Sequence, residues 1–375
     1  MNSAGTLVII KQWSGYFLAL FTFIIHRYAA SGHTTGVYGI YSRMIYPGLR
    51  KLYDHTLGNL PFPFIYVVIS LLAVLLAVMV RQAIKTGKIK GMARGIVQFF
   101  LLVINLAGWL YFLFYFLWGF NYYGPTLSSR LNLPLAKPDS LWLTKEIEGV
   151  TATVNLMRRN ISTDTTELET CPDWDELELY LRNEEAGLLA SLGQRTDGKV
   201  RIRALRPKGL LLRFSTAGVY IPFACEGHVD PGLHCLQWPF TMAHEMAHGY
   251  GFTDEGECNF IALLVCSRSD RDLVRYSALL TYWKYLYFDV STSNDTLASK
   301  YYYNLHAGVR ADLKAIRKAS DKYPDIMPQL RDLIYDNYLK SHGVKKGLAS
   351  YNEIVDLMYK WQKSGRRGVF VTGDL

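Results

Sequence analysis

The chain has 375 residues, half of them hydrophobic, and its formal net charge is +9. Residues 1–118 contain ten Lys and Arg residues and one acid, Asp54, whereas the rest of the chain contains 31 basic and 31 acidic residues. The excess positive charge is therefore confined to an apolar N-terminal part, where it indicates membrane topology and argues against a nucleic-acid-binding surface.

Three apolar stretches of this N-terminal part are predicted to cross a membrane. Residues 62–80 and 95–118 contain no charged side chain and have the length that a transmembrane helix needs. Residues 7–25 form a weaker third span, because they contain Lys11 and other polar residues. A signal peptide is the alternative for that segment. We therefore expect a membrane domain over residues 1–120.

The orientation of these spans follows from the segment that joins the second to the third. Residues 81–94 contain five Lys and Arg residues and no acid. Cytoplasmic loops are enriched in Lys and Arg, so this segment is predicted to be a cytoplasmic loop. Residues 121–375 would then form a domain outside the cytoplasm, and the lipid bilayer is an expected partner.

The first part of the outer domain is predicted to contain two helices and a small sheet. Helices are expected at about 141–160 and 173–192, the second with acidic residues in its first turn. Alternation of apolar and polar residues predicts a short strand at 199–206, and one or two more strands are expected within 210–223.

All five cysteines lie in this outer domain, which suits an oxidising compartment. Cys225 and Cys235 lie ten residues apart around an Asp-Pro-Gly turn and are the favoured disulfide pair. Cys258 and Cys266 are two turns apart on one predicted helix, too far to bridge each other. An odd number of cysteines leaves at least one without a partner in the chain.

A metal-binding motif, H-E-x-x-H, occupies residues 244–248. Residues four apart lie on one face of a helix, so His244 and His248 can bind one metal ion. Glu245 is placed to act as a general base toward a water molecule. Two imidazoles with one further protein ligand and an open position are typical of a catalytic zinc site.

The third ligand is expected on a second helix that follows Gly249 and Gly251. Glu257 is favoured, because it shares one helical face with apolar residues and should point inward. Asp254 is an alternative, since it ends an H-E-x-x-H-x-x-G-x-x-D pattern, and Glu255 is another. Asp254 could equally be the N-cap of this helix and Glu255 an acid in its first turn.

The chain is predicted to be helical from the motif to its end. Further helices are expected at 273–290, 307–322, 326–341 and 351–363. Many enzymes with this motif place a Tyr, His or Arg where it can stabilise an oxyanion. The tyrosines considered for this role are Tyr276, Tyr335, Tyr338 and Tyr351.

Several segments resemble an uncharacterised family of bacterial membrane proteins, catalogued as a domain of unknown function and placed among zincin-like metallopeptidases. The resemblance rests on G-V-Y-I-P-F-A-C-E-G-H at 218–228, on the motif helix and on E-C-N-F-I-A, which begins at Glu257. It implies a mainly α fold, in which transmembrane helices precede an α+β zincin-like domain. It also favours Glu257 over Asp254 as the third ligand, and it implies the bacterial inner membrane as the location.

These observations predict a membrane-anchored zinc metallopeptidase that hydrolyses peptide bonds outside the cytoplasm. Zn²⁺ would be held by His244, His248 and Glu257, with Glu245 as the general base. The expected partner is a peptide or protein substrate. The alternative is a non-catalytic envelope protein that keeps the zinc-binding fold as a structural or peptide-binding module. Nothing in the sequence fixes the oligomeric state.

Overall fold

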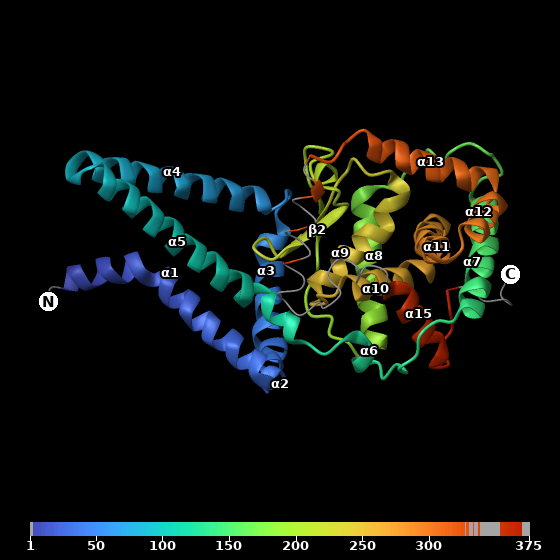
Figure 1. Ribbon diagram of the computed structural model, residues 1–375, viewed down its shortest axis with the longest axis horizontal. Coiled ribbons are helices and arrows are strands. Elements are labelled where there is room, and N and C mark those ends of the chain that lie inside the picture. The colour runs from blue at the N-terminus through green and yellow to red at the C-terminus, as the bar shows by residue number, and fades with distance from the viewer. Residues whose placement is uncertain (1–2, 327, 330–332, 334–336, 338–352, 370–375) are drawn as a thin grey trace. The chain divides into compact units, whose positions relative to one another are not determined.

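The computed structural model describes residues 3–326, 328–329, 333, 337 and 353–369 (Figure 1). Contacts within the chain divide it into two compact units. The first unit comprises the residues up to Gly124 together with residues 221–226, and the second comprises the remainder. Residues 221–226 connect two strands of the sheet, so this short connection is grouped with the N-terminal unit. No pattern in the sequence predicted that grouping.

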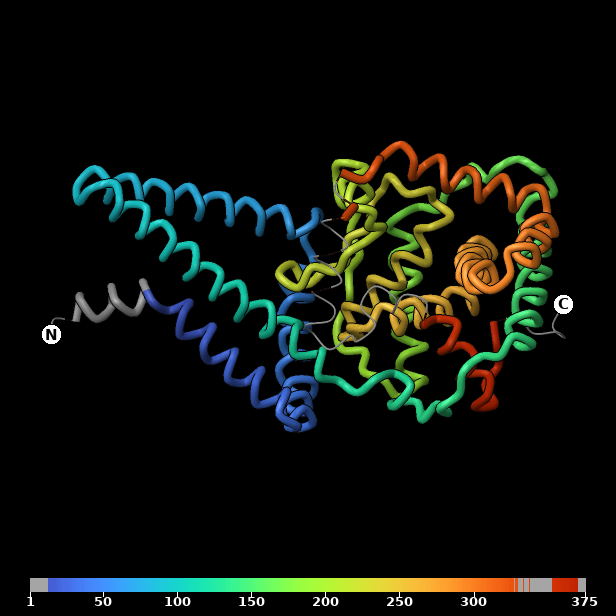
Figure 2. Tube along the Cα trace, viewed as in Figure 1, coloured from blue at the N-terminus to red at the C-terminus, as the bar shows by residue number. Residues whose placement is uncertain are grey.

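Two long apolar helices form a hairpin in the first unit (Figures 1 and 2). Both α4 (Ile65–Lys90) and α5 (Met92–Leu117) are long and apolar enough to cross a membrane. The basic segment 81–90, predicted to be a loop, instead continues α4 as helix. The physical reason is that Arg, Lys, Gln and Ala are good helix formers, and the helix stops only at Gly91, whose φ is +97°.

A third helix, α1 (Ser3–Tyr28), covers the weakest of the predicted spans and packs along α5. The backbone N–H of Gly15 donates to Asn105 Oδ1 at 2.8 Å. The two helices approach closely at glycines, because a Cβ on Gly108 would lie 2.3 Å from the Gly15 carbonyl oxygen. Among the described residues, only α4 and α5 meet the criteria of length and apolarity for a span, so membrane crossing by α1 stays a prediction.

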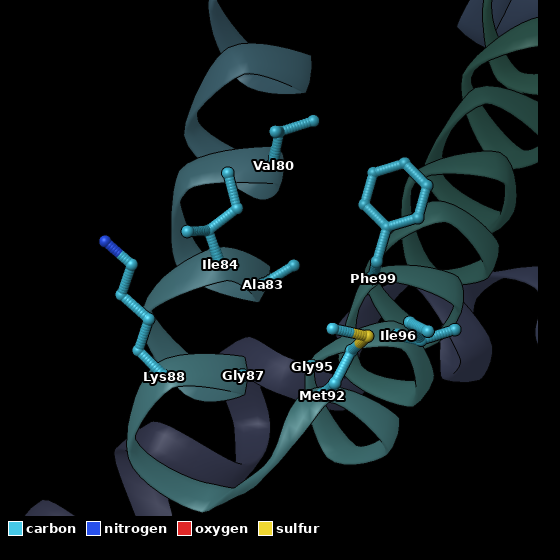
Figure 3. Close-up of a pocket in the computed structure, with 9 residues that line it drawn as sticks. All are labelled: Val80, Ala83, Ile84, Gly87, Lys88, Met92, Gly95, Ile96 and Phe99. Carbon is cyan, nitrogen blue, oxygen red and sulfur yellow. The ribbon is translucent and has the colours of Figure 1, made fainter.

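A cavity of about 530 Å³ lies between α4 and α5 near the turn that joins them (Figure 3). Its walls are apolar apart from the side chain of Lys88. The lining residues are Val80, Ala83, Ile84, Gly87, Lys88, Met92, Gly95, Ile96 and Phe99. All of them belong to the two apolar helices, so this cavity contributes no residue to the histidine motif.

Shorter helices, α2 (Thr34–Ile40) and α3 (Tyr46–His55), run across the ends of α4 and α5 (Figures 1 and 2). Arg50 of α3 is buried and pairs with Asp54 at 3.0 Å. Its second nitrogen, Nη1, donates to the carbonyl oxygen of Cys225 at 2.7 Å. The carboxylate of Glu226 accepts a hydrogen bond from the backbone N–H of Phe64 at 2.7 Å. Buried polar side chains of the first unit therefore hold the connection at residues 221–226.

The second unit is mainly helical, as the sequence predicts. Its longer helices are α7 (Ser140–Ile161), α8 (Trp174–Ser191), α9 (Trp238–Gly249), α10 (Glu255–Ser267), α11 (Asp272–Ser293), α12 (Asp295–Asn304), α13 (Ala307–Asp321) and α15 (Glu353–Lys363). A short helix, α6 (Leu127–Arg130), comes before them. The predicted helices at 326–341 and at the start of 351–363 involve residues outside the described part of the chain.

Three short strands form the sheet of this unit, in the order β1-β3-β2. They are β1 (Ile202–Ala204), β2 (Gly218–Ile221) and β3 (Glu226–Val229). β1 pairs with β3 in parallel, with Ile202 opposite Gly227. Part of the region predicted as strand at 210–223 is instead a short 3₁₀ helix at Leu212–Phe214. Among the described strands, β2 therefore lies at one edge of the sheet.

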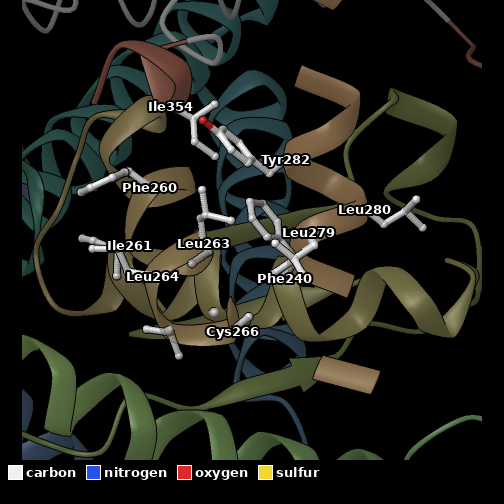
Figure 4. Close-up of a cluster of buried hydrophobic side chains, with 14 of the residues drawn as sticks. Phe240, Phe260, Ile261, Leu263, Leu264, Cys266, Leu279, Leu280, Tyr282 and Ile354 are labelled. Carbon is white, nitrogen blue, oxygen red and sulfur yellow. The ribbon is translucent and has the colours of Figure 1, made fainter. Parts of the chain in front are cut away.

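The hydrophobic core lies around α9, α10 and α11 (Figure 4). Every residue of α10 from Glu255 to Cys266 is buried, so this helix has no solvent-exposed face. Large core side chains such as Phe240, Leu263 and Tyr282 pack between the helices. Each such side chain contributes on the order of 1.5–3 kcal/mol of burial free energy, which makes the helix pair α9–α10 a rigid support for polar groups.

The disulfide joins Cys171 to Cys235, which corrects the predicted pair Cys225–Cys235. Cys225 belongs to the connection at residues 221–226, and its carbonyl is bound by Arg50. Cys171 instead precedes α8, and its Cα lies 5.5 Å from that of Cys235 just before α9. Cys225, Cys258 and Cys266 are buried free thiols.

Candidate metal centre

The motif residues lie on α9, a buried helix that begins at Trp238 with Pro239 in its first turn. Proline suits that position because the first N–H groups of a helix have no acceptor within it. His244 and His248 project from one face, and their ring centroids are 4.9 Å apart. Only 8% and 7% of their surfaces are exposed. The fold therefore holds both imidazoles side by side in a nearly dry interior.

A single carboxylate of α10 joins the two histidines. Glu255 Oε2 lies 3.0 Å from His244 Nε2 and 3.4 Å from His248 Nε2. The ligand atoms of these three residues lie within 4.8 Å of one another, a spacing that can hold one metal ion. Two imidazole nitrogens and one carboxylate oxygen form the ligand set of many catalytic zinc sites.

The structure places Glu255, rather than the favoured Glu257, beside the histidines. The Glu257 carboxylate accepts a hydrogen bond from the backbone N–H of Leu127 at 2.5 Å. Burial and the neighbouring Asp254 raise the pKa of Glu257 to about 8. Asp254 is the N-cap of α10 and accepts from the backbone N–H of Glu257 at 3.0 Å. Because all sides of α10 are buried, an inward direction alone did not select which acid faces the histidines.

Glu255 carries the negative charge that a metal ligand needs. Burial alone would raise its pKa, but the adjacent His248 and His244 hold the pKa of Glu255 well below its usual value. The carboxylate is therefore ionised near neutral pH, which is the form that coordinates a metal.

Hydrogen bonds on the far side of each ring fix the orientation of the histidines. His244 Nδ1 donates to Asn259 Oδ1 at 2.8 Å, and His248 Nδ1 donates to the Phe252 carbonyl oxygen at 2.9 Å. A proton on Nδ1 leaves the lone pair of Nε2 for a metal, so both rings present Nε2 to the same point. The thiol of Cys258 also lies 3.3 Å from His248 Nδ1.

Asn259 and Tyr285 complete this arrangement, and the H-E-x-x-H motif predicts neither residue. Asn259 Nδ2 donates to the Tyr285 hydroxyl at 3.1 Å. Burial, with a contribution from Glu255, raises the pKa of Tyr285 to about 12, so the hydroxyl keeps its proton. The available signal was the spacing of Asn259, four residues after Glu255 and thus on the same side of α10.

The base predicted from the motif, Glu245, lies beside the sheet. Its carboxylate accepts a hydrogen bond from the backbone of Tyr220 in β2. Within the described part of the chain, its other oxygen, Oε2, is buried without a hydrogen-bond partner. A Cβ on Gly218 would lie 2.6 Å from Glu245 Oε1, so a larger residue at this position would require the Glu245 side chain to move. Burial raises the pKa of Glu245 to about 7, although both histidines of the motif oppose that shift.

A protein family described as "Protein of unknown function (DUF3810)" matches residues 41–359. The chain belongs to this family. The matched residues include α4 and α5 as well as α9 and α10, so the apolar helices and the histidine cluster both fall within the family's extent. No curated protein and no solved structure matches the chain.

Of the tyrosines considered for oxyanion stabilisation, Tyr276 has a different role. Its hydroxyl donates to Asp312 Oδ2 at 2.7 Å, and Asp312 also binds Arg158 at 2.8 Å. Tyr276 therefore belongs to a buried polar network that joins α7, α11 and α13. Tyr335, Tyr338 and Tyr351 lie outside the described residues. Tyr285 is the tyrosine that the structure connects to the cluster, through Asn259.

Proposed function

We propose that this protein is a membrane-anchored zinc metallopeptidase of the gluzincin type, acting on peptides or proteins outside the cytoplasm. The observation that carries the proposal is the convergence of His244, His248 and Glu255, with Glu245 one residue from the first ligand. A purely structural zinc site usually has four protein ligands and needs no neighbouring base. Three ligands beside a carboxyl whose pKa is about 7 suit catalysis.

The residues present fit a zinc ion. Nδ1 of each ring donates elsewhere, so a metal that displaces the proton from Nε2 would find both Nε2 lone pairs directed at the ionised Glu255 carboxylate. Without a metal, burial alone would lower the pKa of His248, but Cys258 and Glu255 raise it well above its usual value. Glu255 Oε2 lies within 3.4 Å of both Nε2 atoms. One divalent cation among these three atoms could bind all of them. When bound, zinc supplies Lewis acidity, which lowers the pKa of a water molecule and polarises a carbonyl group.

Glu245 would supply the proton transfers. Its carboxylate takes a proton from the attacking water and returns it to the leaving amine. The Tyr220 backbone N–H holds one side of this carboxylate, and Oε2, which has no partner among the described residues, remains for the reacting proton. Burial raises the pKa of Glu245 above its usual value, which favours acceptance of a proton by this carboxylate.

The edge strand β2 provides a way to align a substrate. An extended peptide can add itself to a sheet edge through backbone hydrogen bonds. β2 runs past Glu245, since Gly218 and Tyr220 both lie against that carboxylate. A peptide paired with β2 would therefore pass beside the base.

The membrane location rests on the first unit. α4 and α5 have the length and apolarity of spans, and basic residues are concentrated where they meet. By the positive-inside rule, that turn lies in the cytoplasm and the other ends of the helices lie outside it. The disulfide Cys171–Cys235 agrees with an oxidising compartment for the second unit. The proposed location is the bacterial inner membrane, with the second unit in the periplasm or outside the cell.

The test uses the full-length protein in detergent and its Glu245→Gln variant. Zinc content is measured by mass spectrometry, and hydrolysis is followed with fluorescently labelled casein and with a mixed peptide library. We expect both proteins to bind zinc and Glu245→Gln to lose at least about 100-fold in hydrolysis, because proton transfer by a positioned base contributes that much. Full activity of zinc-loaded Glu245→Gln would contradict the proposed mechanism. Zinc without any hydrolysis by the wild type would favour the non-catalytic alternative.

A further inference from the structure

The segment from α2 to α3 exposes large apolar side chains and buries an ion pair. A helix at the surface of a soluble protein buries apolar side chains and exposes polar ones. Here Ile40, Met44 and Leu52 are 60%, 72% and 64% exposed. Arg50 and Asp54, in contrast, are 1% and 6% exposed and form an ion pair. Contact between these apolar side chains and water is therefore unfavourable.

Three of the exposed apolar residues form one stripe. Ile40, Met44 and Leu52 are separated by four and eight residues, and exposed Gly48 takes the intervening position. A wide helical turn at Tyr41–Ile45 joins α2 to α3. Because such a turn contains more residues than an α-helical one, a four-residue repeat stays on one side across the junction. The exposed apolar side chains thus lie on one side of the folded segment and are not scattered over its surface.

The charges that flank the stripe are all of one sign. Arg43 and Lys51 are exposed, and Asp54, the single acid of residues 1–118, is buried against Arg50. An apolar face flanked by cations is the pattern of helices that lie at the surface of an anionic bilayer. A second copy of the same face would bring like charges together, so self-association through it is disfavoured.

The position of the segment within the first unit agrees with this reading. The Tyr41 hydroxyl donates to the Phe116 carbonyl oxygen in the last turn of α5 at 3.1 Å, and its ring packs edge-on against Phe120. α2 and α3 run across the ends of α4 and α5 instead of alongside them (Figures 1 and 2). If α4 and α5 cross a bilayer, a helix lying across their ends lies in the plane of its surface.

We propose that the face formed by Ile40, Met44 and Leu52, flanked by Arg43 and Lys51, lies in the interface of the lipid bilayer at the non-cytoplasmic ends of α4 and α5. The apolar stripe contacts acyl chains, and the two cations lie near lipid phosphates. The inference rests on the membrane anchoring proposed above and does not depend on the metal site.

The test places a nitroxide spin label at Met44→Cys or Leu52→Cys in the full-length protein. Cys225, Cys258 and Cys266 are buried and are first replaced by serine or alanine. The protein is reconstituted in nanodiscs of phosphatidylcholine and phosphatidylglycerol, and collisions of the label with oxygen and with a water-soluble nickel complex are measured. Leu76→Cys on α4 and Tyr303→Cys on α12 serve as references, since both positions are exposed.

We expect labels at Met44 and Leu52 to show an oxygen-to-nickel collision ratio several-fold above that at Tyr303 and below that at Leu76. If the labels at Met44 and Leu52 show the ratio found at Tyr303 while the label at Leu76 is exposed to lipid, the inference is wrong but the membrane anchoring stands. A water-exposed label at Leu76 would overturn the membrane anchoring as well. Labels at Met44 and Leu52 that meet neither reagent would show a protein contact on this face and would also overturn it.

Discussion

Asn259 gives α10 a second contact with the histidine cluster, beside that of Glu255. Glu255 supplies a carboxylate to the cluster, and one turn later Asn259 accepts the Nδ1 proton of His244. A partner of this kind fixes the tautomer and direction of a ligating imidazole. Asn259→Ala removes the acceptor, and Asn259→Asp retains it.

We expect Asn259→Ala to bind zinc about 10- to 100-fold more weakly than the wild type, which is the usual cost of losing such a partner. Asn259→Asp should bind zinc at least as tightly as the wild type, because a carboxylate accepts the same proton. Competition with a zinc chelator measures both affinities. Equal affinities of the wild type and Asn259→Ala would show that the His244–Asn259 hydrogen bond is dispensable.

Glu185 of α8 is a buried acid without a role in the proposed reaction. It is fully buried, and within the described structure neither carboxylate oxygen has a hydrogen-bond partner. Burial raises its pKa well above the usual value, although His248 opposes the shift. The folded protein therefore retains a proton that the unfolded chain releases above about pH 4.3. Below that pH, Glu185 is protonated in both states and its ionisation does not affect the free energy of unfolding. As the pH rises from there toward the raised pKa of the folded state, the free energy of unfolding decreases.

Glu185→Gln should remove this dependence, because glutamine has a similar shape and does not titrate. The free energy of unfolding of the variant, relative to that of the wild type, is expected to be higher at pH 8 than at pH 5. Thermal or chemical unfolding at the two pH values measures the difference. Glu184→Gln, at the exposed neighbouring position, is the matched control and should follow the wild type. A Glu185→Gln difference that does not change with pH would contradict the burial argument.

At the residue scale, the motif predicted that His244 and His248 lie together, as the structure has them, but it favoured Glu257 over Glu255, the acid that the structure brings to them. His244, Glu245 and His248 lie on one helix, so their mutual placement follows from helix geometry alone. The third acid belongs to another helix, and its direction depends on how α10 packs against α9. That packing is tertiary, and three acids within four residues made the local pattern ambiguous.

At the scale of elements, the connection at residues 221–226 joins the two strands that lie beside Glu245. It is bounded by Tyr220 and Gly227, and both of these residues lie against Glu245. Arg50 binds the Cys225 carbonyl at 2.7 Å, and Cys225 has a φ of +51°, a conformation that a residue with a side chain adopts at some cost. The hydrogen bond from Arg50 thus stabilises a strained turn between the two strands.

Two double variants isolate that hydrogen bond. Arg50→Met with Asp54→Asn removes the ion pair and the donor, whereas Arg50→Gln with Asp54→Asn removes the ion pair and keeps an amide donor. Neither double variant leaves an unpaired buried charge, which by itself would destabilise this region. We expect amide exchange in residues 218–229 to be up to about tenfold faster in the methionine variant than in the glutamine variant, because a neutral amide hydrogen bond contributes about 0.5–1.5 kcal/mol. Exchange measured by mass spectrometry on the full-length protein decides this, and equal rates would contradict the proposed role of Arg50.

The predicted helices agree well with the observed ones where they lie in the described chain. The helices predicted at 141–160, 173–192, 273–290 and 307–322 correspond to α7, α8, α11 and α13. Their caps are local: Asp139 and Asp173 each accept from the backbone N–H three residues on. Helix periodicity and capping are properties of short segments, so the sequence carries them. The change from apolar to basic residues after Val80 predicts the end of the span, but it does not end the helix, since α4 continues to Lys90.

At the scale of the whole molecule, features that join distant segments were the ones that sequence reasoning missed. The disulfide spans 64 residues, and proximity in sequence favoured the wrong partner for Cys235. The grouping of residues 221–226 with the first unit depends on contacts of Arg50 and Phe64 more than 160 residues away. Composition still predicted the broad organisation, an apolar N-terminal part and a mainly helical remainder, because charge and hydrophobicity are unevenly distributed along the chain.

The central claim is that His244, His248 and Glu255 hold one zinc ion, and metal content tests it most directly. Full-length protein is purified in detergent beside its Glu255→Gln and Glu257→Gln variants, and zinc is measured by mass spectrometry. Glutamine keeps the size of each side chain, and at position 257 it can still accept from Leu127. We predict one zinc per chain in the wild type and in Glu257→Gln, and none in Glu255→Gln. Loss of zinc only in Glu257→Gln, or a folded wild type without metal, would contradict the account.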